Sequence, residues 1–249
     1  MLWKSSDRLH QEGRRVSYCP AGIVRWLTSL SPVRIDGSES RSSGRGAIHS
    51  WIDVASFPFC ADKDDYLLFL GRISLGKGVH HAIDVARRLG RRRIVASKVD
   101  RVDRTYVSRP IKPTTDGRLI TFVGEAEAEQ KRALLAGAEG LLNPITWSEP
   151  FGLVMVEAMT CGTRVIAFNR GSAPELIVYG ETRYIVHDVD GTTQTVFRFD
   201  RIDPASCRQH TQANFDTPRT VDGYLAVYRK VRSNTAGLGK GRQGDKRRA

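Results

Sequence analysis

Residues 140–168, GLLNPITWSEPFGLVMVEAMTCGTRVIAF, place a short apolar run, a helical run and a second apolar run in direct succession. GLLN and RVIAF have the length and composition of buried strands, and Gly162 ends the helical run between them. Pro150 is expected at the first helical position, where its missing N–H costs nothing, with Ser148 and Glu149 at the helix entrance. The order strand, helix, strand predicts one parallel βαβ unit.

Two carboxylates in this stretch, Glu149 and Glu157, form an E-x7-E pattern. The start of a helix offers unpaired N–H groups to an anion. Gly152 lets a ligand approach the backbone closely, and carboxylates accept hydrogen bonds from hydroxyl groups. The stretch alone also fits a capped amphipathic helix with two solvated glutamates, and at this point both interpretations stay open.

The same alternation continues on both sides of the stretch. We expect strands at residues 65–72, 92–97, 119–123, 140–143, 164–168 and 184–186, and helices at 79–89, 103–111, 126–138, from 171 and at 217–231. This order predicts an α/β fold with a doubly wound, Rossmann-like parallel sheet. Ligands bind such sheets at the edge where the strand-to-helix loops gather, which here means residues 72–77, 123–125, 144–152 and 169–175.

The pattern divides the chain of 249 residues into three parts. Residues 63–232 form the predicted Rossmann-like domain. Residues 1–62 are an irregular N-terminal segment and linker, too short and too polar to build a convincing core alone. Residues 233–249 form a Gly-rich basic tail that we expect to be disordered.

Charge and cysteine usage narrow the functional class. The net charge of +12 comes largely from an arginine cluster at 87–93 and from the tail. A basic nucleic-acid-binding protein is therefore one alternative, disfavoured because the chain has no recognition helix or aromatic platform. The four cysteines have no paired spacing, which argues against a zinc site or a disulfide framework and fits a reducing compartment. Cys161, which follows the apolar helix, is expected to be a small buried filler.

The location of the protein follows from what the sequence lacks. No apolar run reaches the ~18 residues that span a bilayer, and the first residues have no signal-peptide core. We therefore expect a cytoplasmic protein, and a peripheral position at the inner membrane surface stays open.

The predicted ligand edge combines cations, hydroxyl acceptors and backbone N–H groups. Arg72 and Lys77 flank its first turn, and such a pair suits a diphosphate because Arg offers a fork of donors and Lys a mobile point charge. A diphosphate together with hydroxyl groups that meet Glu149 and Glu157 describes a sugar nucleotide.

Four segments, FLGRISLGKG, FVGE, NPITWSEPFGLVMVEAMTCGTRVIAF and RGSAPELI, resemble the C-terminal donor domain of the retaining glycosyltransferases of family 4, which have the GT-B fold. The resemblance covers about residues 52–228 and makes the chain one GT-B half. It implies that Arg72 and Lys77 bind the donor diphosphate, that Glu149 lies beside the transferred sugar and that Glu157 binds the ribose. It further implies backbone contacts from Phe151, Gly152 and Leu153, and it places Val123 near the base.

The resemblance also implies partners and limits. The donor is a nucleotide-diphosphate sugar, with no cofactor and no metal, and the acceptor is a glycan, lipid or small molecule. The first 62 residues do not match the family's acceptor domain, so a second polypeptide is a candidate source of that half. Ser97 stands where the family has glycine and is expected to crowd the donor crevice. The alternatives are a nucleotide-sugar-binding module without activity and an epimerase, the latter disfavoured by the E-x7-E pattern.

Overall fold

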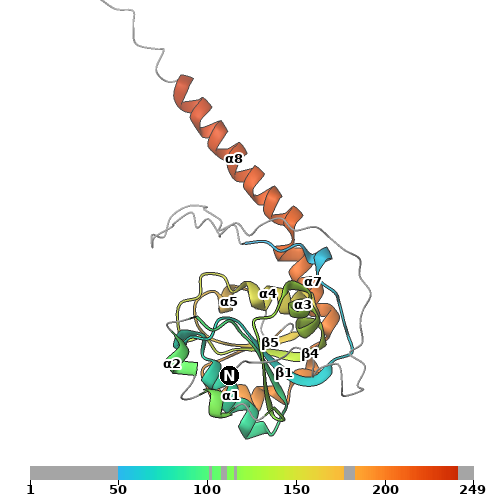
Figure 1. Ribbon diagram of the computed structural model, residues 1–249. Coiled ribbons are helices and arrows are strands. Elements are labelled where there is room, and N and C mark those ends of the chain that lie inside the picture. Colours follow the sequence, from blue (N-terminus) through green and yellow to red (C-terminus); the bar gives the residue numbers. More distant parts are fainter. Residues whose placement is uncertain (1–49, 101–102, 108–110, 115–116, 177–182, 241–249) are drawn as a thin grey trace, which may run out of the picture.

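The computed structural model describes residues 50–100, 103–107, 111–114, 117–176 and 183–240. Most of the predicted N-terminal segment, residues 1–49, lies outside these residues, so the expected domain boundary at 62 stays a prediction. The described part forms one parallel sheet with helices on both faces, as the sequence predicts (Figure 1). Its strands are β1 (Asp64–Leu70), β2 (Arg93–Ala96), β3 (Ile120–Gly124), β4 (Ala138–Asn143), β5 (Arg164–Phe168) and β6 (Arg183–Val186).

The helices alternate with the strands along the chain. They are α1 (Val79–Leu89), α2 (Arg104–Tyr106), α3 (Ala128–Gly137), α4 (Leu153–Thr160), α5 (Ala173–Leu176), α6 (Val189–Val196), α7 (Pro204–Phe215) and α8 (Thr217–Lys240). Short 3-10 turns complete the pattern at η2 (Val54–Ser56), η3 (Leu75–Lys77), η6 (Lys112–Thr114) and η7 (Phe199–Arg201).

The strand order is β3-β2-β1-β4-β5-β6, and every neighbouring pair is parallel. The chain therefore moves outward from β1 to β3, crosses back to β4 and moves outward again. The order reverses between β1 and β4, and a crevice opens outside the carboxyl ends of the strands at such a reversal. The loops after β1 and β4 meet at this point.

Apolar side chains fill the space between the sheet and its helices. The strands of the centre are almost fully buried, as in Leu67, Leu68 and Leu141, because helices cover both faces. Helices α1 and α6 pack on one another. Helix α4 packs against α3 and α7 (Figure 1). Cys161 is fully buried at the end of α4, as predicted for a small filler.

The segment before β1 is fastened to the C-terminal helices. The N–H of Ile52 donates to the carbonyl of Phe215 at 2.9 Å. The guanidinium of Arg208, on α7, donates to the carbonyl of Phe57 at 3.0 Å and to that of Val54 at 3.1 Å. Because these bonds satisfy backbone carbonyls that no strand pairs, residues 52–57 take a fixed course along the domain.

Three expectations about helices need correction. Helix α4 starts at Leu153 rather than at Pro150, because Gly152 precedes it in the left-handed conformation with φ 80° and acts as its N-cap. Ser148 and Glu149 therefore lie in a loop and not at the helix entrance. Helix α8 continues to Lys240 instead of ending at residue 231. The predicted helix at 103–111 is reduced to α2, with 108–110 outside the described residues.

The sequence analysis did not predict two of the helices, α6 and α7. Helix α6 begins after Asp188, whose carboxylate accepts a hydrogen bond from the N–H of Gly191, and α7 begins after Asp203, which caps Ala205 and Ser206. None of the helices in the described ranges combines the length and apolar content that crossing a bilayer requires.

Candidate functional site

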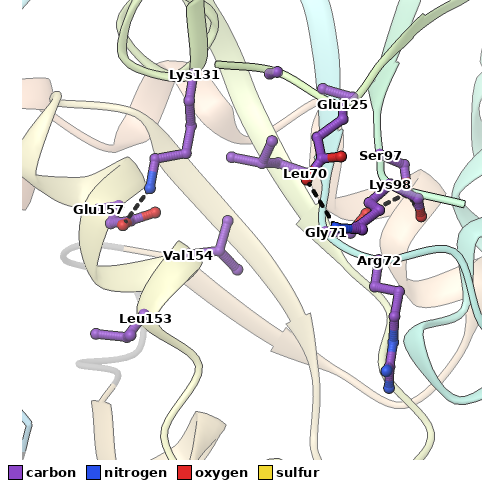
Figure 2. Close-up of a pocket in the computed structure, with 12 residues that line it drawn as sticks. Leu70, Gly71, Arg72, Ser97, Lys98, Glu125, Lys131, Leu153, Val154 and Glu157 are labelled. Carbon is purple, nitrogen blue, oxygen red and sulfur yellow. Dashed lines mark hydrogen bonds and ion pairs between the residues drawn. The ribbon is translucent and has the colours of Figure 1, made fainter. Parts of the chain in front are cut away.

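A cavity of about 350 Å³ lies at the carboxyl edge of the sheet, where the strand order reverses. The ends of β1, β2 and β3 form one wall, and the first turns of α4 form the other (Figure 2). Its lining residues are Leu70, Gly71, Arg72, Ala96, Ser97, Lys98, Glu125, Ala126, Lys131, Leu153, Val154 and Glu157. The apolar members suit a flat organic group, and the charged members suit phosphates and hydroxyls.

The turn that carries Lys77 is fixed to the loop after β4. Gly78 has φ 72°, and a Cβ atom there would lie 2.0 Å from the carbonyl oxygen of Pro144. The N–H of Thr146 donates to the carbonyl of Gly76 at 2.9 Å. Only a residue without a side chain allows this approach, so the Lys-Gly sequence brings the turn after β1 against the loop that carries Glu149.

Lys77 and Glu149 form an ion pair through Nζ and Oε2, and both side chains are largely buried. The Lys77 ammonium also lies 5.1 Å from the centroid of the Trp147 ring. An indole face attracts a cation electrostatically. Two groups of the same loop therefore hold the lysine in place.

The loop of Glu149 is clamped from its other side by the turn after β5. Gly171 has φ 56°, and a Cβ atom there would lie 2.4 Å from both the backbone nitrogen and the carbonyl oxygen of Glu149. The N–H of Ser172 donates to the carbonyl of Glu149 at 2.9 Å, and its hydroxyl donates to the carbonyl of Phe151 at 2.6 Å. The GSAPE turn thus fixes the backbone of Glu149.

Helix α4 presents its first turn to the cavity. Gly152 and Phe151 are buried behind it, whereas Leu153 and Val154 line the cavity. The N–H groups of the first helical residues have no partner within the helix, and the positive end of the helix dipole adds to them. This part of the cavity can therefore receive an anion.

Three ion pairs surround the cavity. Lys131 Nζ lies 2.7 Å from an oxygen of Glu157, Arg72 lies 3.5 Å from Asp100, and Lys98 lies 3.4 Å from Glu125. The Lys131–Glu157 pair is the most buried of the three. The exposed pairs contribute little to stability because water screens them.

The predicted site residues fall into two groups. Arg72, Leu153 and Glu157 line the cavity directly. The other predicted residues do not line it. Lys77 and Glu149 pair with one another, Phe151 and Gly152 are buried directly before α4, and Val123 packs on the core.

Ser97 also lies where the sequence suggested. It is buried in the cavity wall, and its hydroxyl donates to the carbonyl of Gly71. The bond turns its oxygen toward the loop after β1.

Sequence reasoning missed Lys131 and Trp147. The sequence around Lys131 predicts a helix but no contact for its side chain. The pairing of Lys131 with Glu157 depends on how α3 packs on α4. Trp147 precedes Glu149 by two positions, yet its contact with Lys77 arises only when the loops after β1 and β4 meet.

Two histidines, His80 and His81, lie in the first turn of α1 near this edge. The rings of His80 and His81 lie 3.9 Å apart, and the Nδ1 of His80 is hydrogen-bonded to the hydroxyl of Tyr106. Burial lowers the pKa of His80 and of His81 below the usual range. Both imidazoles are therefore neutral at physiological pH and add no charge to the edge.

The sequence matches a known family over more than half of its length. Residues 57–194 match the family described as glycosyl transferases group 1. Glycogen synthase of Mycobacterium tuberculosis (strain ATCC 25618 / H37Rv) is 31% identical over 205 residues, which cover 74% of this chain and 49% of that protein. The chain thus spans about half the length of this curated relative.

Solved structures share the fold. Sucrose-phosphate synthase from Thermosynechococcus elongatus superposes with a TM-score of 0.65 at 23% identity, over 75% of this chain and 52% of that one. Anabaena HepE, solved in complex with UDP and glucose, superposes with a TM-score of 0.59 at 21% identity, over 72% and 49%. The fold is therefore the Rossmann-like fold found in these glycosyltransferase structures, as the sequence predicts.

Proposed function

The chain belongs to the glycosyl transferases group 1, and we propose that it transfers a sugar from a nucleotide-diphosphate sugar to an acceptor hydroxyl with retention of configuration. The observation that carries the proposal is the Lys77–Glu149 ion pair, held where the loops after β1, β4 and β5 meet. Arg72 and helix α4 line a cavity of about 350 Å³ at the same edge of the sheet. The family 4 resemblance of the E-x7-E stretch supports retention.

The ion pair suggests how donor binding prepares the site. The diphosphate attracts the Lys77 ammonium, with Arg72 and the first turn of α4 as further positive groups. When Lys77 turns to the phosphates, Glu149 regains a free carboxylate oxygen, which accepts a hydrogen bond from a sugar hydroxyl. The pair therefore links recognition of the diphosphate to recognition of the sugar.

The transfer step follows from where charge develops. The bond between the anomeric carbon and the β-phosphate oxygen breaks, and negative charge grows on the departing nucleoside diphosphate. The acceptor oxygen forms the new bond to the anomeric carbon from the same face, and its proton passes to the departing phosphate oxygen. Lys77, Arg72 and α4 stabilise the leaving group, and removing one such preorganised group typically costs ~3–4 kcal/mol of barrier stabilisation.

We propose that these positive groups perform the role that a metal ion performs at other diphosphate sites. Turnover should accordingly persist in EDTA. Among the described residues no cluster of three His, Cys, Asp or Glu side chains is placed to hold a metal ion.

The acceptor side is proposed from the family alone. The acceptor is a glycan, a lipid or a small molecule that carries a free hydroxyl, and a further domain or a second polypeptide presents it to the donor site. Anabaena HepE, whose structure holds UDP and glucose, supports UDP-glucose as a first donor to try.

Two substitutions test the proposal. Lys77→Ala and Glu149→Ala are each expected to abolish transfer and to leave the protein folded, because neither side chain belongs to the apolar core. Wild-type turnover in either variant would contradict the assignment of Lys77 and Glu149 to the active site.

The second candidate function is a nucleotide-sugar-binding module without transfer. In this structure Lys77 and Glu149 pair with one another and neither lines the cavity, and that arrangement favours it. The two functions separate in one experiment: the module binds the donor and neither hydrolyses nor transfers it, whereas the transferase releases the nucleoside diphosphate when an acceptor is present.

A further inference from the structure

Lys131 is a cavity residue to which neither the sequence pattern nor the proposed transfer chemistry assigns a role. It lies on α3, and its ammonium is 2.7 Å from Oε1 of Glu157 on α4 (Figure 2). The side chain of Lys131 is 29% exposed and that of Glu157 is 14% exposed. An ion pair that water reaches so little is screened weakly, so it constrains both side chains more than a surface pair does.

The position of Lys131 is defined on a second side. Its ammonium lies 5.9 Å from the centroid of the Phe57 ring, which belongs to the buried core. The ring of Phe57 and the carboxylate of Glu157 thus both attract the ammonium of Lys131. A cation on an aromatic face and beside a carboxylate has little freedom to move.

We propose that Lys131 is a positioning residue that fixes the carboxylate of Glu157 for the ribose hydroxyls of the donor. The inference rests on the proposed function, which assigns the ribose to Glu157. A carboxylate has two oxygens with about four acceptor sites. Lys131 occupies a site on Oε1, which leaves Oε2 and the remaining acceptor sites for hydroxyl donors.

The charge of Lys131 has a second consequence at the same place. The donor carries a diphosphate, and an uncompensated carboxylate in the cavity would repel it. Without Lys131, the carboxylate of Glu157 would also be free to turn toward water. Lys131 therefore keeps an acceptor group in a cavity that has to receive an anion.

The test measures ribose discrimination rather than affinity alone. The nucleoside diphosphate that binds the wild type most tightly among UDP, GDP and ADP is compared with its 2′,3′-dideoxy form by titration calorimetry. Charge repulsion changes both dissociation constants alike and cancels in their ratio, whereas misplacement of Glu157 affects only the ribose form. The wild-type ratio should be roughly tenfold or more, the size expected for hydrogen bonds to a charged group.

Matched variants show whether the positive charge at position 131, rather than any lysine of the cavity wall, is responsible for the ratio. In Lys131→Met the ratio should fall to roughly threefold or less, and Lys131→Arg should restore it because guanidinium also pairs with a carboxylate. Lys131→Gln serves as a second neutral variant if the methionine variant does not fold. Lys98→Met is the control, since Lys98 is another lysine of the cavity wall whose carboxylate partner is Glu125. Its ratio should equal that of the wild type.

Each result decides between separate claims. If the neutral variants at position 131 keep the wild-type ratio of dissociation constants and Glu157→Gln lowers it, the inference is wrong and the proposed function stands. An unchanged ratio in Glu157→Gln would remove ribose binding from Glu157 and overturn the inference as well. Failure of every nucleotide to bind the wild type would refute the proposed function, and the inference would fall with it.

Discussion

Replacing Gly171 with alanine tests whether the turn after β5 holds Glu149 in place. An alanine Cβ at this position would lie 2.4 Å from the backbone nitrogen and the carbonyl oxygen of Glu149, where ordinary van der Waals contact begins at 3.4 Å. The backbone of Glu149 therefore has to move by about 1 Å, a displacement that can lower turnover by about 100-fold when it shifts a catalytic group.

The matched control is Gly90→Ala. Gly90 has φ 62° at the end of α1, and a Cβ there meets nothing within 4 Å. Both variants place alanine in the left-handed conformation, which costs roughly 1–2 kcal/mol. Only Gly171→Ala adds overpacking, at typically ~1–3 kcal/mol.

Urea unfolding and donor turnover, measured on the same preparations, give the result. Gly90→Ala is expected to lose the strain energy alone and to keep wild-type turnover. Gly171→Ala should lose more stability than the control and about two orders of magnitude in turnover. Equal stability of the two variants together with full turnover in Gly171→Ala would refute the clamping of Glu149.

Two further predictions concern buried charges away from the site. Arg93, on β2, is fully buried, and its three guanidinium nitrogens have no hydrogen-bond partner among the described residues; burial lowers its pKa to about 9. Arg93→Met should therefore raise the free energy of unfolding by about 1–4 kcal/mol in a chemical denaturation experiment, and a loss of stability would contradict this reasoning. Burial likewise lowers the pKa of Lys63 to about 8 from an ordinary value of 10.5. Between these two pKa values the unfolded chain holds more protons at Lys63 than the folded chain does. The free energy of unfolding of the wild type, relative to that of Lys63→Met, should therefore rise by about 1 kcal/mol from pH 8 to pH 9. A relative free energy that does not change with pH would contradict this prediction.

The fold was predictable because its signals are local. The predicted bounds of α1 and β5 coincide with those of the structure, since apolar periodicity and the flanking glycines define both elements. The alternation of such elements then fixes the parallel sheet and the edge at which ligands bind.

The helix bounds were predicted wrongly where one residue is compatible with two local structures. Pro150 can begin a helix, and Gly152 can permit close approach of a ligand, but the left-handed conformation of Gly152 starts the helix only after it. Asp203 followed by Pro204 is typical of a helix start and could have predicted α7. The polar composition of the segment shows no apolar periodicity, so the helix was not predicted. The polar sequence from residue 233 predicts a disordered tail, whereas α8 continues into it as far as Lys240.

The contacts of the site depend on tertiary packing. The sequence pointed to Lys77 and Glu149 through spacing and resemblance, and the structure pairs them because Gly78 and Gly171 let three loops meet. No spacing relates Lys131 to Glu157, since their elements are joined by packing of α3 on α4.

Thermal unfolding with UDP-, GDP- and ADP-sugars tests most directly whether this edge of the sheet binds a sugar nucleotide, with Lys77 on its diphosphate. A donor at about 100 times its dissociation constant should stabilise the wild type by about 2.7 kcal/mol. For a domain of this size that corresponds to a rise of roughly 5–10 °C in melting temperature. Lys77→Met should lose most of that rise, measured against its own ligand-free melting temperature. An unchanged melting temperature with every donor, or the same rise in Lys77→Met, would contradict the account.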